Sequence, residues 1–258
     1  RQIHSLSVAT YAPSTYSRDQ LVSHGVPRVG IWGRGVDKQR FHPSKRSEEL
    51  RAQWAPNGEV VVGYMGRLAA EKRVQDMAVL ADIPGVKLVI VGHGPDRDQL
   101  EKQIPGAIFT GGLGGEDLPR AVASMDVFCS TGELETFCQA VQEAKACGVP
   151  VISPRRGGPI DLIDPSRTGW LYEPGNMDEF RSYVVDLVGD GYKRRAMGTA
   201  ARASIEDRTW GHLCAELVGH YEEAIRIGSV AAPARHRLLS AATHHSRRNG
   251  HSISLLHR

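Results

Sequence analysis

One segment organises the rest of the chain: GELETFCQAVQEA, residues 132–144. It follows an apolar run at residues 126–130 that predicts a strand, and it opens a helix that we expect to end at Cys147, before the GVP of residues 148–150. Thr136 and Gln139 have the spacing of a capping box, which predicts that the helix begins there. A helix that starts directly after a parallel strand presents free backbone N–H groups, and such a start suits a phosphate.

Two carboxylates stand eight residues apart around this predicted anion site. Glu135 comes just before the expected helix, and Glu143 lies on the flank of its buried stripe. That stripe is predicted to consist of Phe137, Ala140, Val141 and Ala144. The alternative is that Glu135 only complements the helix dipole while Glu143 faces solvent. On this motif alone, the two interpretations are about equally favoured.

The bulk composition is that of an ordinary globular protein. Apolar residues make up 41% of the 258 positions and charged residues 24%, and a net charge of +3 gives no reason to expect nucleic acid as a partner. The four cysteines form no CxxC pair, so we expect reduced thiols in a cytoplasmic core rather than a metal site. No membrane span or signal peptide is recognisable. Because the first residue is Arg1, we expect a fragment.

Strand and helix patterns alternate regularly from about residue 58. Near-continuous apolar runs predict strands at residues 60–65, 86–91, 107–110, 127–130, 149–153 and 169–172. Helices are predicted from about residue 71 and at residues 96–103, 116–124, 136–147, 159–163, 177–188, 192–206 and 210–227. This alternation predicts an α/β fold with a doubly wound, Rossmann-like parallel sheet. Such sheets bind ligands at the carboxyl ends of their strands.

The pattern divides the chain into three regions. Residues 1–43 hold a strand at 6–10, a helix at 14–24 and a strand at 29–32, which are too few to bury a core. We interpret them as the end of a preceding domain and a linker. Residues 44–228 form the regular α/β domain. Residues 229–258 are basic, and a disordered tail is favoured there over a metal or nucleic-acid site.

Two cations stand at the end of the first strand of the α/β domain. Gly66 and Arg67 follow the strand, and Lys72 lies where the next helix is expected to begin. Cations in the first turn of a helix oppose its dipole, and a bound anion would remove that conflict. Arg67 and Lys72 could therefore both contact one diphosphate. The alternative is that they only add surface charge, which is the better interpretation for Arg73.

The next two strand ends carry weaker signals. Gly92 and Gly94 end the second strand, where two glycines permit a close approach of the backbone to a ligand. Phe109 and Thr110 end the third strand and could present an aromatic edge and main-chain groups to a base. A plain turn explains the two glycines equally well, and a core position explains Phe109 about as well.

Several enzyme classes lack their signatures in this chain. No Ser-His-Asp order, HExxH or P-loop is present. The first strand ends in Gly66-Arg67-Leu68 rather than in GxGxxG, which argues against a nicotinamide dehydrogenase.

Six motifs in order resemble the family-4 retaining glycosyltransferases, whose GT-B architecture has two facing Rossmann-like domains. They are Gly66-Arg67-Leu68 with Glu71-Lys72, Gly92-x-Gly94, Glu135-x7-Glu143, Gly148-Val149-Pro150-Val151, Gly157-Gly158 and Thr168-Gly169-Trp170-Leu171. With a linker-like stretch at residues 33–43, they cover about residues 28–187. The sequences of residues 32–37 (WGRGVD) and 135–139 (ETFCQ) are most similar to those of bacterial GDP-mannose-dependent α-mannosyltransferases that act on lipids or glycolipids.

The resemblance implies roles for individual residues. It implies that Arg67 and Lys72 bind the donor diphosphate and stabilise it as the leaving group. It also places Glu135 beside the transferred sugar. With these three as catalytic residues, the predicted donor-binding residues are Gly66, Gly92, Gly94, Phe109, Thr110, Cys138, Gln139, Ala140 and Glu143. Within that set, Glu143 is expected to hold the ribose hydroxyls. Two cations and a helix start can carry the developing charge, so we expect no metal and no cofactor besides the nucleotide-sugar substrate.

Three departures from the family pattern affect these expectations. Cys138 replaces a common Gly and narrows the space beside the phosphates, and Asp161 replaces a common Glu. The family's N-terminal domain, which carries the acceptor site, a glycine-rich loop and a catalytic His, has no counterpart here.

The sequence therefore predicts the C-terminal, donor-binding half of a retaining glycosyltransferase. The resemblance implies transfer of a hexose, with mannose from GDP-mannose favoured, to a lipid or glycan acceptor bound mainly by the missing domain. We expect this half alone to be inactive, and we expect it to act in the cytoplasm, with peripheral contact to the inner face of the membrane. Two alternatives stay open: a non-catalytic nucleotide-sugar-binding module, and the same fold using a UDP-sugar.

Overall fold

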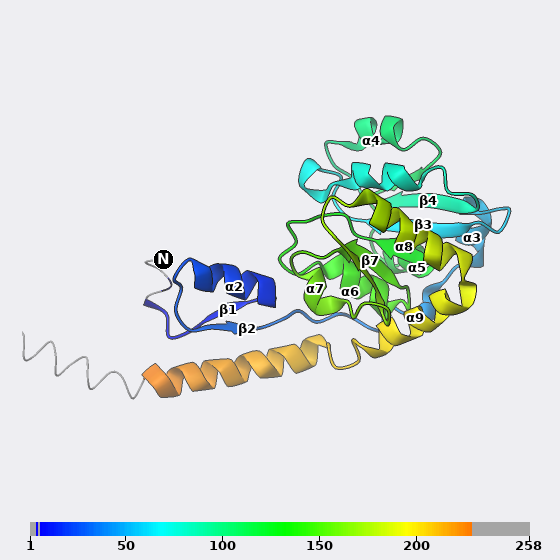
Figure 1. The fold of residues 1–258 in the computed structure, drawn as a ribbon. Helices are drawn as coiled ribbons and strands as arrows, with labels where there is room; N and C mark the ends of the chain where they lie inside the picture. The colour runs from blue at the N-terminus through cyan, green and yellow to red at the C-terminus, as the bar shows by residue number, and fades with distance from the viewer. Residues whose placement is uncertain (1–3, 5, 229–258) are drawn as a thin grey trace, which may run out of the picture.

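A six-stranded parallel sheet forms the centre of the computed structural model, which describes residue 4 and residues 6–228 (Figure 1). Its strands are β3 (Val60–Met65), β4 (Val86–Val91), β5 (Ile108–Gly111), β6 (Val127–Cys129), β7 (Val151–Pro154) and β8 (Gly169–Tyr172). They pair in the order β5-β4-β3-β6-β7-β8, with every pairing parallel. This is the doubly wound order, which reverses between β3 and β6, so the predicted fold class is confirmed.

Helices cover both faces of this sheet. They are α3 (Glu48–Trp54), α4 (Arg97–Gln103), α5 (Asp117–Ala123), α6 (Gln139–Ala146), α7 (Pro159–Leu162), α8 (Met177–Gly189) and α9 (Gly191–Ala203), with the 3₁₀ helices η1 (Pro43–Lys45), η2 (Ala70–Lys72) and η3 (Val74–Leu80). Successive strand residues point to opposite faces, so Val61 joins the buried cluster around Phe128 and Val141, whereas Val62 joins the cluster around Leu80 and Phe180. The apolar strand runs are therefore buried on both sides.

The helix predicted from about residue 71 is wrong in type. The chain forms η2 and η3 instead, and they are separated by Arg73, whose φ of 51° is left-handed. A left-handed residue breaks the regular helical hydrogen-bond ladder, so no α-helix can run through this position. The break leaves Lys72 at the end of η2, close to the end of β3.

Residues before the main sheet form a separate small unit of β1 (Thr10–Ala12), α2 (Thr15–Ser23) and β2 (Val29–Ile31). We call these residues, 10–31, the N-terminal unit. Helical residues 210–228 run beside it (Figure 1), and the ring of His220 stacks on Tyr11 at a centroid distance of 4.2 Å. The strand predicted at residues 6–10 overlaps β1 only at Thr10, and the carbonyls of Ser7 and Val8 before it accept from the Arg28 guanidinium.

The domain boundaries predicted from the sequence stay a prediction. The chain continues from the N-terminal unit through residues 33–43 into the domain that holds the main sheet. The basic segment at residues 229–258 lies outside the described residues.

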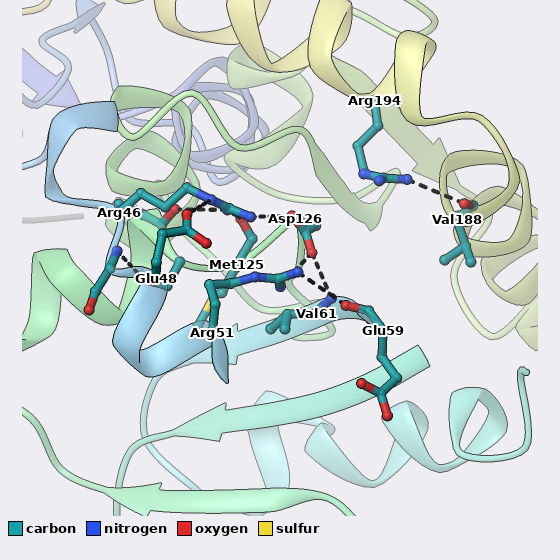
Figure 2. A network of polar contacts seen from close by, with 12 residues as sticks. Arg46, Glu48, Arg51, Glu59, Val61, Met125, Asp126, Val188 and Arg194 are labelled. Carbon is teal, nitrogen blue, oxygen red and sulfur yellow. Dashed lines mark hydrogen bonds and ion pairs between the residues drawn. The ribbon is translucent and has the colours of Figure 1, made fainter. Parts of the chain in front are cut away.

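A polar network holds the amino-terminal edge of the sheet together (Figure 2). The carboxylate of Asp126 accepts from Arg51 Nη1 at 2.6 Å, from Arg46 Nη2 at 3.0 Å and from the backbone N–H of Val61 at 2.8 Å. It therefore ties α3 to the starts of β3 and β6. This network lies at the edge opposite the strand ends that carry the predicted site.

Candidate active site

Two predicted catalytic residues meet at the carboxyl ends of β3 and β6, where the strand order reverses. Lys72 follows β3 and Glu135 follows β6, and Lys72 Nζ lies 2.6 Å from Glu135 Oε1. Their side chains are only 28% and 16% exposed, so the pair is partly withdrawn from water. The hydroxyl of Thr131 donates to the carbonyl of Lys72 at 2.7 Å and fixes the backbone of η2. A cation and a carboxylate are thus held at the position where doubly wound sheets bind ligands.

Arg67 lies at the end of β3 and is 64% exposed. Its guanidinium forms a short ion pair with the carboxylate of Glu71. A hydrogen bond from its own backbone lowers the pKa of Glu71, and the charges of Arg67 and Lys72 lower it further. Arg67 and Lys72 thus pair with different carboxylates, Glu71 and Glu135, and their shared contact with one diphosphate stays a prediction.

The start of α6 differs from the predicted capping box. The helix begins at Gln139, preceded by Cys138 in the left-handed region with φ 72°. Thr136 therefore does not cap it, and the Gln139 amide donates to the carbonyl of Gly35 at 3.0 Å instead. Among the described residues no side-chain hydrogen bond caps this start, although the N–H of Val141 donates to the carbonyl of Cys138 at 3.2 Å. A helix start without a side-chain cap can offer its remaining N–H groups to an anion.

Cys138 is buried beside this helix start. Its Sγ lies 3.5 Å from Ser130 Oγ, and burial raises the pKa of its thiol to about 12. The thiol is therefore neutral at physiological pH and is no nucleophile. All four cysteines are free, as predicted, but Cys214 is exposed rather than in the core.

Glu143 lies in a cavity of about 380 Å³ between α6 and the linker. The other lining residues are Arg34, Asp37, Arg40, Phe41, Gln139 and Trp210. Burial raises the pKa of Glu143 to about 7, although Arg40 and Gln139 act in the opposite direction. The carboxyl is thus poised between its two protonation states near neutral pH, and it does not face solvent freely as the alternative interpretation supposed.

A second cavity, of about 580 Å³, opens at the carboxyl ends of β3 and β4. Its lining residues are Met65, Gly66, Arg67, Val91, Gly92, His93, Gly112, Leu113, Gly114 and Leu118. Arg40 donates to the carbonyl of Gly115 at 3.1 Å, next to Gly114 in the wall, so its side chain lies between the two cavities. The apolar walls and the cationic rim suit a flat, uncharged ring joined to an anionic group.

The glycines at the ends of β3 and β4 have packing reasons that the sequence did not show. A Cβ on Gly92 would lie 1.8 Å from the carbonyl oxygen of Gly66, and one on Gly94 would lie 2.1 Å from that of Leu68. A Cβ on Gly66 would lie 2.6 Å from the hydroxyl of Tyr64. These glycines therefore let neighbouring loops approach one another, and Gly66 and Gly92 also line the larger cavity.

Phe109 and Thr110 are not among the lining residues of either described cavity. Phe109 pairs with Ile90 and packs with the cluster on the other face of the sheet, 6.0 Å below the guanidinium of Arg97. Leu113, three residues after Thr110, lines the cavity in their place. The structure thus favours the core interpretation of Phe109.

Two functional candidates were missed from the sequence. Tyr64 is buried below the site, where its hydroxyl donates to the Arg67 carbonyl at 3.1 Å, and burial with the nearby Glu135 charge raises its pKa. The Gln142 amide donates to the carbonyl of Arg34 at 2.9 Å and, with Gln139, fastens the linker to α6. No motif identifies such residues, because their roles depend on which loop packs above them.

In the part of the chain that the structure describes, no three His, Cys, Asp or Glu side chains gather in a way that could hold a metal ion. No helix in the same part combines the length and the apolar character needed to cross a membrane.

The sequence of this domain matches a protein-family model. The model, described as "Glycosyl transferases group 1", matches residues 46–204. The chain belongs to this family, which confirms the resemblance seen in the motifs.

Curated relatives narrow the comparison. The chain is 50% identical over 223 residues to a GDP-mannose-dependent alpha-mannosyltransferase of Mycobacterium tuberculosis, covering 86% of this chain and 58% of that protein. It is 49% identical over 233 residues to a protein of the same description from Mycolicibacterium smegmatis, covering 90% of this chain and 61% of that protein. The chain thus spans about three-fifths of the length of these relatives.

Solved structures share the fold. The crystal structure of Anabaena Alr3699/HepE in complex with UDP and glucose superposes with a TM-score of 0.76, over 85% of this chain and 64% of that one. The two sequences are 23% identical, so this likeness concerns the fold alone.

Proposed function

We propose that this chain is the donor-binding part of a GDP-mannose-dependent α-mannosyltransferase. The observation that carries the proposal is the Lys72–Glu135 pair, at the start of α6 and at the reversal of strand order, in a chain about 50% identical to two such enzymes. In this proposal the base occupies the cavity of about 580 Å³, the ribose reaches Glu143 in the cavity of about 380 Å³, and the diphosphate extends towards Lys72.

The two cations and the helix start stabilise the leaving group. As the sugar–phosphate bond breaks, negative charge grows on the diphosphate, and Arg67, Lys72 and the first N–H groups of α6 face it. Because these donors are held in place before the reaction, they need no metal ion to neutralise that charge. The family resemblance implies that the anomeric configuration is retained.

The two carboxylates have separate roles in this proposal. Glu135, held by Lys72, lies beside the transferred sugar and accepts from its hydroxyls. Glu143 accepts from the ribose hydroxyls in its ionised form. Cys138 stands beside the phosphates as a neutral thiol and limits the space there.

The acceptor half of the reaction lies outside these residues. The resemblance places a lipid or glycan acceptor mainly on the family's N-terminal domain, and it supports peripheral contact with a membrane surface. Turnover therefore requires that domain, whereas donor binding can be tested on this chain.

A calorimetric titration panel tests the proposal. GDP, GDP-mannose, UDP, UDP-glucose and NAD are titrated into the chain in the presence of a chelator. Tighter binding of GDP and GDP-mannose than of the other three supports it. A preference for UDP-glucose would keep the fold but overturn the donor, and a requirement for a divalent metal would overturn the metal-free mechanism.

A further inference from the structure

The N-terminal unit contacts the α/β domain directly beside the Glu135 loop. Ser14, which is 1% exposed, donates from its hydroxyl to the carbonyl of Thr136 at 2.6 Å. Thr15 donates from its backbone N–H to Asp161 Oδ2 at 2.6 Å, and its hydroxyl makes a short hydrogen bond to Asp161 Oδ1. These partners are more than 120 residues apart in the chain, so the contacts join two separately formed units.

Asp161 serves two helix starts at once. It lies in the first turn of α7 and accepts from the first residue of α2, so its charge is favourable at both positive helix ends. Both oxygens of its carboxylate are engaged by Thr15. A charge-assisted pair of this kind fixes direction as well as distance.

The backbone that carries Glu135 is held from both sides. The Glu135 carbonyl accepts from the N–H of Gly158 at 2.7 Å, within the α/β domain. The next carbonyl, that of Thr136, accepts from Ser14 of the N-terminal unit. A Cβ on Gly157 would lie 2.3 Å from the Glu135 carbonyl oxygen, so the turn before α7 presses closely on this segment. The Thr136 carbonyl also accepts a longer hydrogen bond from Ser17 Oγ at 3.3 Å, so the restraints that cross between the units converge on this one carbonyl.

We propose that Ser14, Thr15 and Asp161 form a clasp that positions Glu135, so that the placement of the N-terminal unit governs the sugar contact of the donor site. When the clasp is closed, the Glu135–Thr136 backbone is held on two sides and the carboxylate stays against Lys72. When the units separate, the Thr136 carbonyl loses its partner and Glu135 is held from one side alone. The three clasp residues are positioning residues, and this inference rests on the proposed donor site.

Hydrogen exchange tests the clasp without any ligand. In Asp161→Asn and Ser14→Ala, amides of residues 134–137 should exchange about tenfold faster, as expected when a charge-assisted or buried hydrogen bond is lost. Asp161→Glu, which keeps the charge, should recover slow exchange. Asp164→Asn is the matched control, since Asp164 also carries an acidic side chain near α7 but forms its ion pair with the exposed Arg167. Unchanged exchange in both clasp variants, or equal acceleration in the control, would overturn the proposal.

Titration with two donor ligands distinguishes a role in positioning Glu135 from a general loss of structure at the donor site. Asp161→Asn should weaken GDP-mannose binding about tenfold while leaving the affinity for GDP unchanged, because GDP has no sugar to contact Glu135. An equal loss for both ligands would mean a structural role only. If the unaltered chain binds neither ligand, the proposed function fails, whereas the exchange result still decides whether the clasp positions the loop.

Discussion

Lys72 Nζ lies 2.6 Å from Glu135 Oε1 and joins the loop after β3 to the loop after β6. The two residues are 63 positions apart in the chain and follow strands that are adjacent in the sheet. Their contact places a cation and a carboxylate together where a diphosphate and a sugar would meet. In a partly buried pair of this kind, a charged ligand that binds nearby changes the electrostatic environment of both side chains.

Replacing Glu135 by Gln should separate nucleotide binding from sugar binding. The side chain keeps its shape, and Lys72 loses the partner that competes with the diphosphate. We expect GDP to bind about as tightly as before or up to roughly threefold more tightly, as for the loss of one partly exposed ion pair. The preference for GDP-mannose over GDP should disappear. Calorimetry with both ligands measures this, and a GDP affinity that falls more than tenfold would contradict it.

Donor binding should depend on pH through Glu143. Its pKa rises from 4.5 to about 7 on folding, so the folded state binds a proton that the unfolded state releases between these values. The contribution of this group to stability therefore falls as pH rises through that window. Ribose hydroxyls need the ionised carboxylate as acceptor, so GDP affinity should increase about tenfold between pH 6 and pH 8.

Two variants test whether Glu143 is the group that causes this pH dependence. Glu143→Gln should abolish the increase in GDP affinity, whereas Glu101→Gln, at an exposed position far along α4, should preserve it. An increase that persists in Glu143→Gln would assign the pH dependence to another group.

Cys138 should tolerate Gly but reject a β-branched residue. Its φ of 72° is strained for any side chain, and most of all for one that branches at Cβ. We expect Cys138→Val to lower the free energy of unfolding by about 2 kcal/mol or more, and Cys138→Gly to change it by less than about 1 kcal/mol. Urea unfolding measures both. Cys147→Val is the control, because Cys147 is buried at an ordinary φ of −78° and should cost less than about 1.5 kcal/mol.

Gly92 should be indispensable to the larger cavity. Its φ of 150° and the 1.8 Å approach of a Cβ to the Gly66 carbonyl mean that Gly92→Ala must displace backbone. We expect a loss of at least about 2 kcal/mol in unfolding free energy, together with weaker nucleotide binding. Gly114 lines the same cavity with open space around its Cβ position, so Gly114→Ala should leave the free energy of unfolding almost unchanged. Equal stability of the two variants would refute this role for Gly92.

The sheet was predictable because its strands are buried on both faces. Apolar runs marked β3, β4 and β8 with the bounds that the structure has. The local backbone was not predictable: left-handed Arg73 and Cys138 broke the expected helix starts, and nothing in their side chains favours that conformation. Their geometry follows from the loops that pack against them.

The side chains of the candidate site were predictable only in part. The sequence predicts that Lys72 and Glu135 lie close together, because each follows a central strand of the sheet, and the structure places them in contact. Phe109 pairs with Ile90 and so faces the other cluster, an outcome set by a register that the sequence does not show. The capping-box spacing predicts a cap at Gln139, but the Gln139 amide donates to the linker carbonyl of Gly35, and the path of the linker depends on tertiary packing.

The most direct test of the central claim is a metal-free calorimetric titration of GDP-mannose into the unaltered chain and into Lys72→Ala. Loss of one charged hydrogen bond to the diphosphate should weaken binding by about 1.5–3 kcal/mol. Lys87→Ala is the matched control, because Lys87 lies near the start of β4, away from the carboxyl ends of the strands, where it donates to the Gly106 carbonyl at 3.4 Å. The account predicts the loss in Lys72→Ala alone; unchanged binding in that variant would contradict the assignment of the donor site.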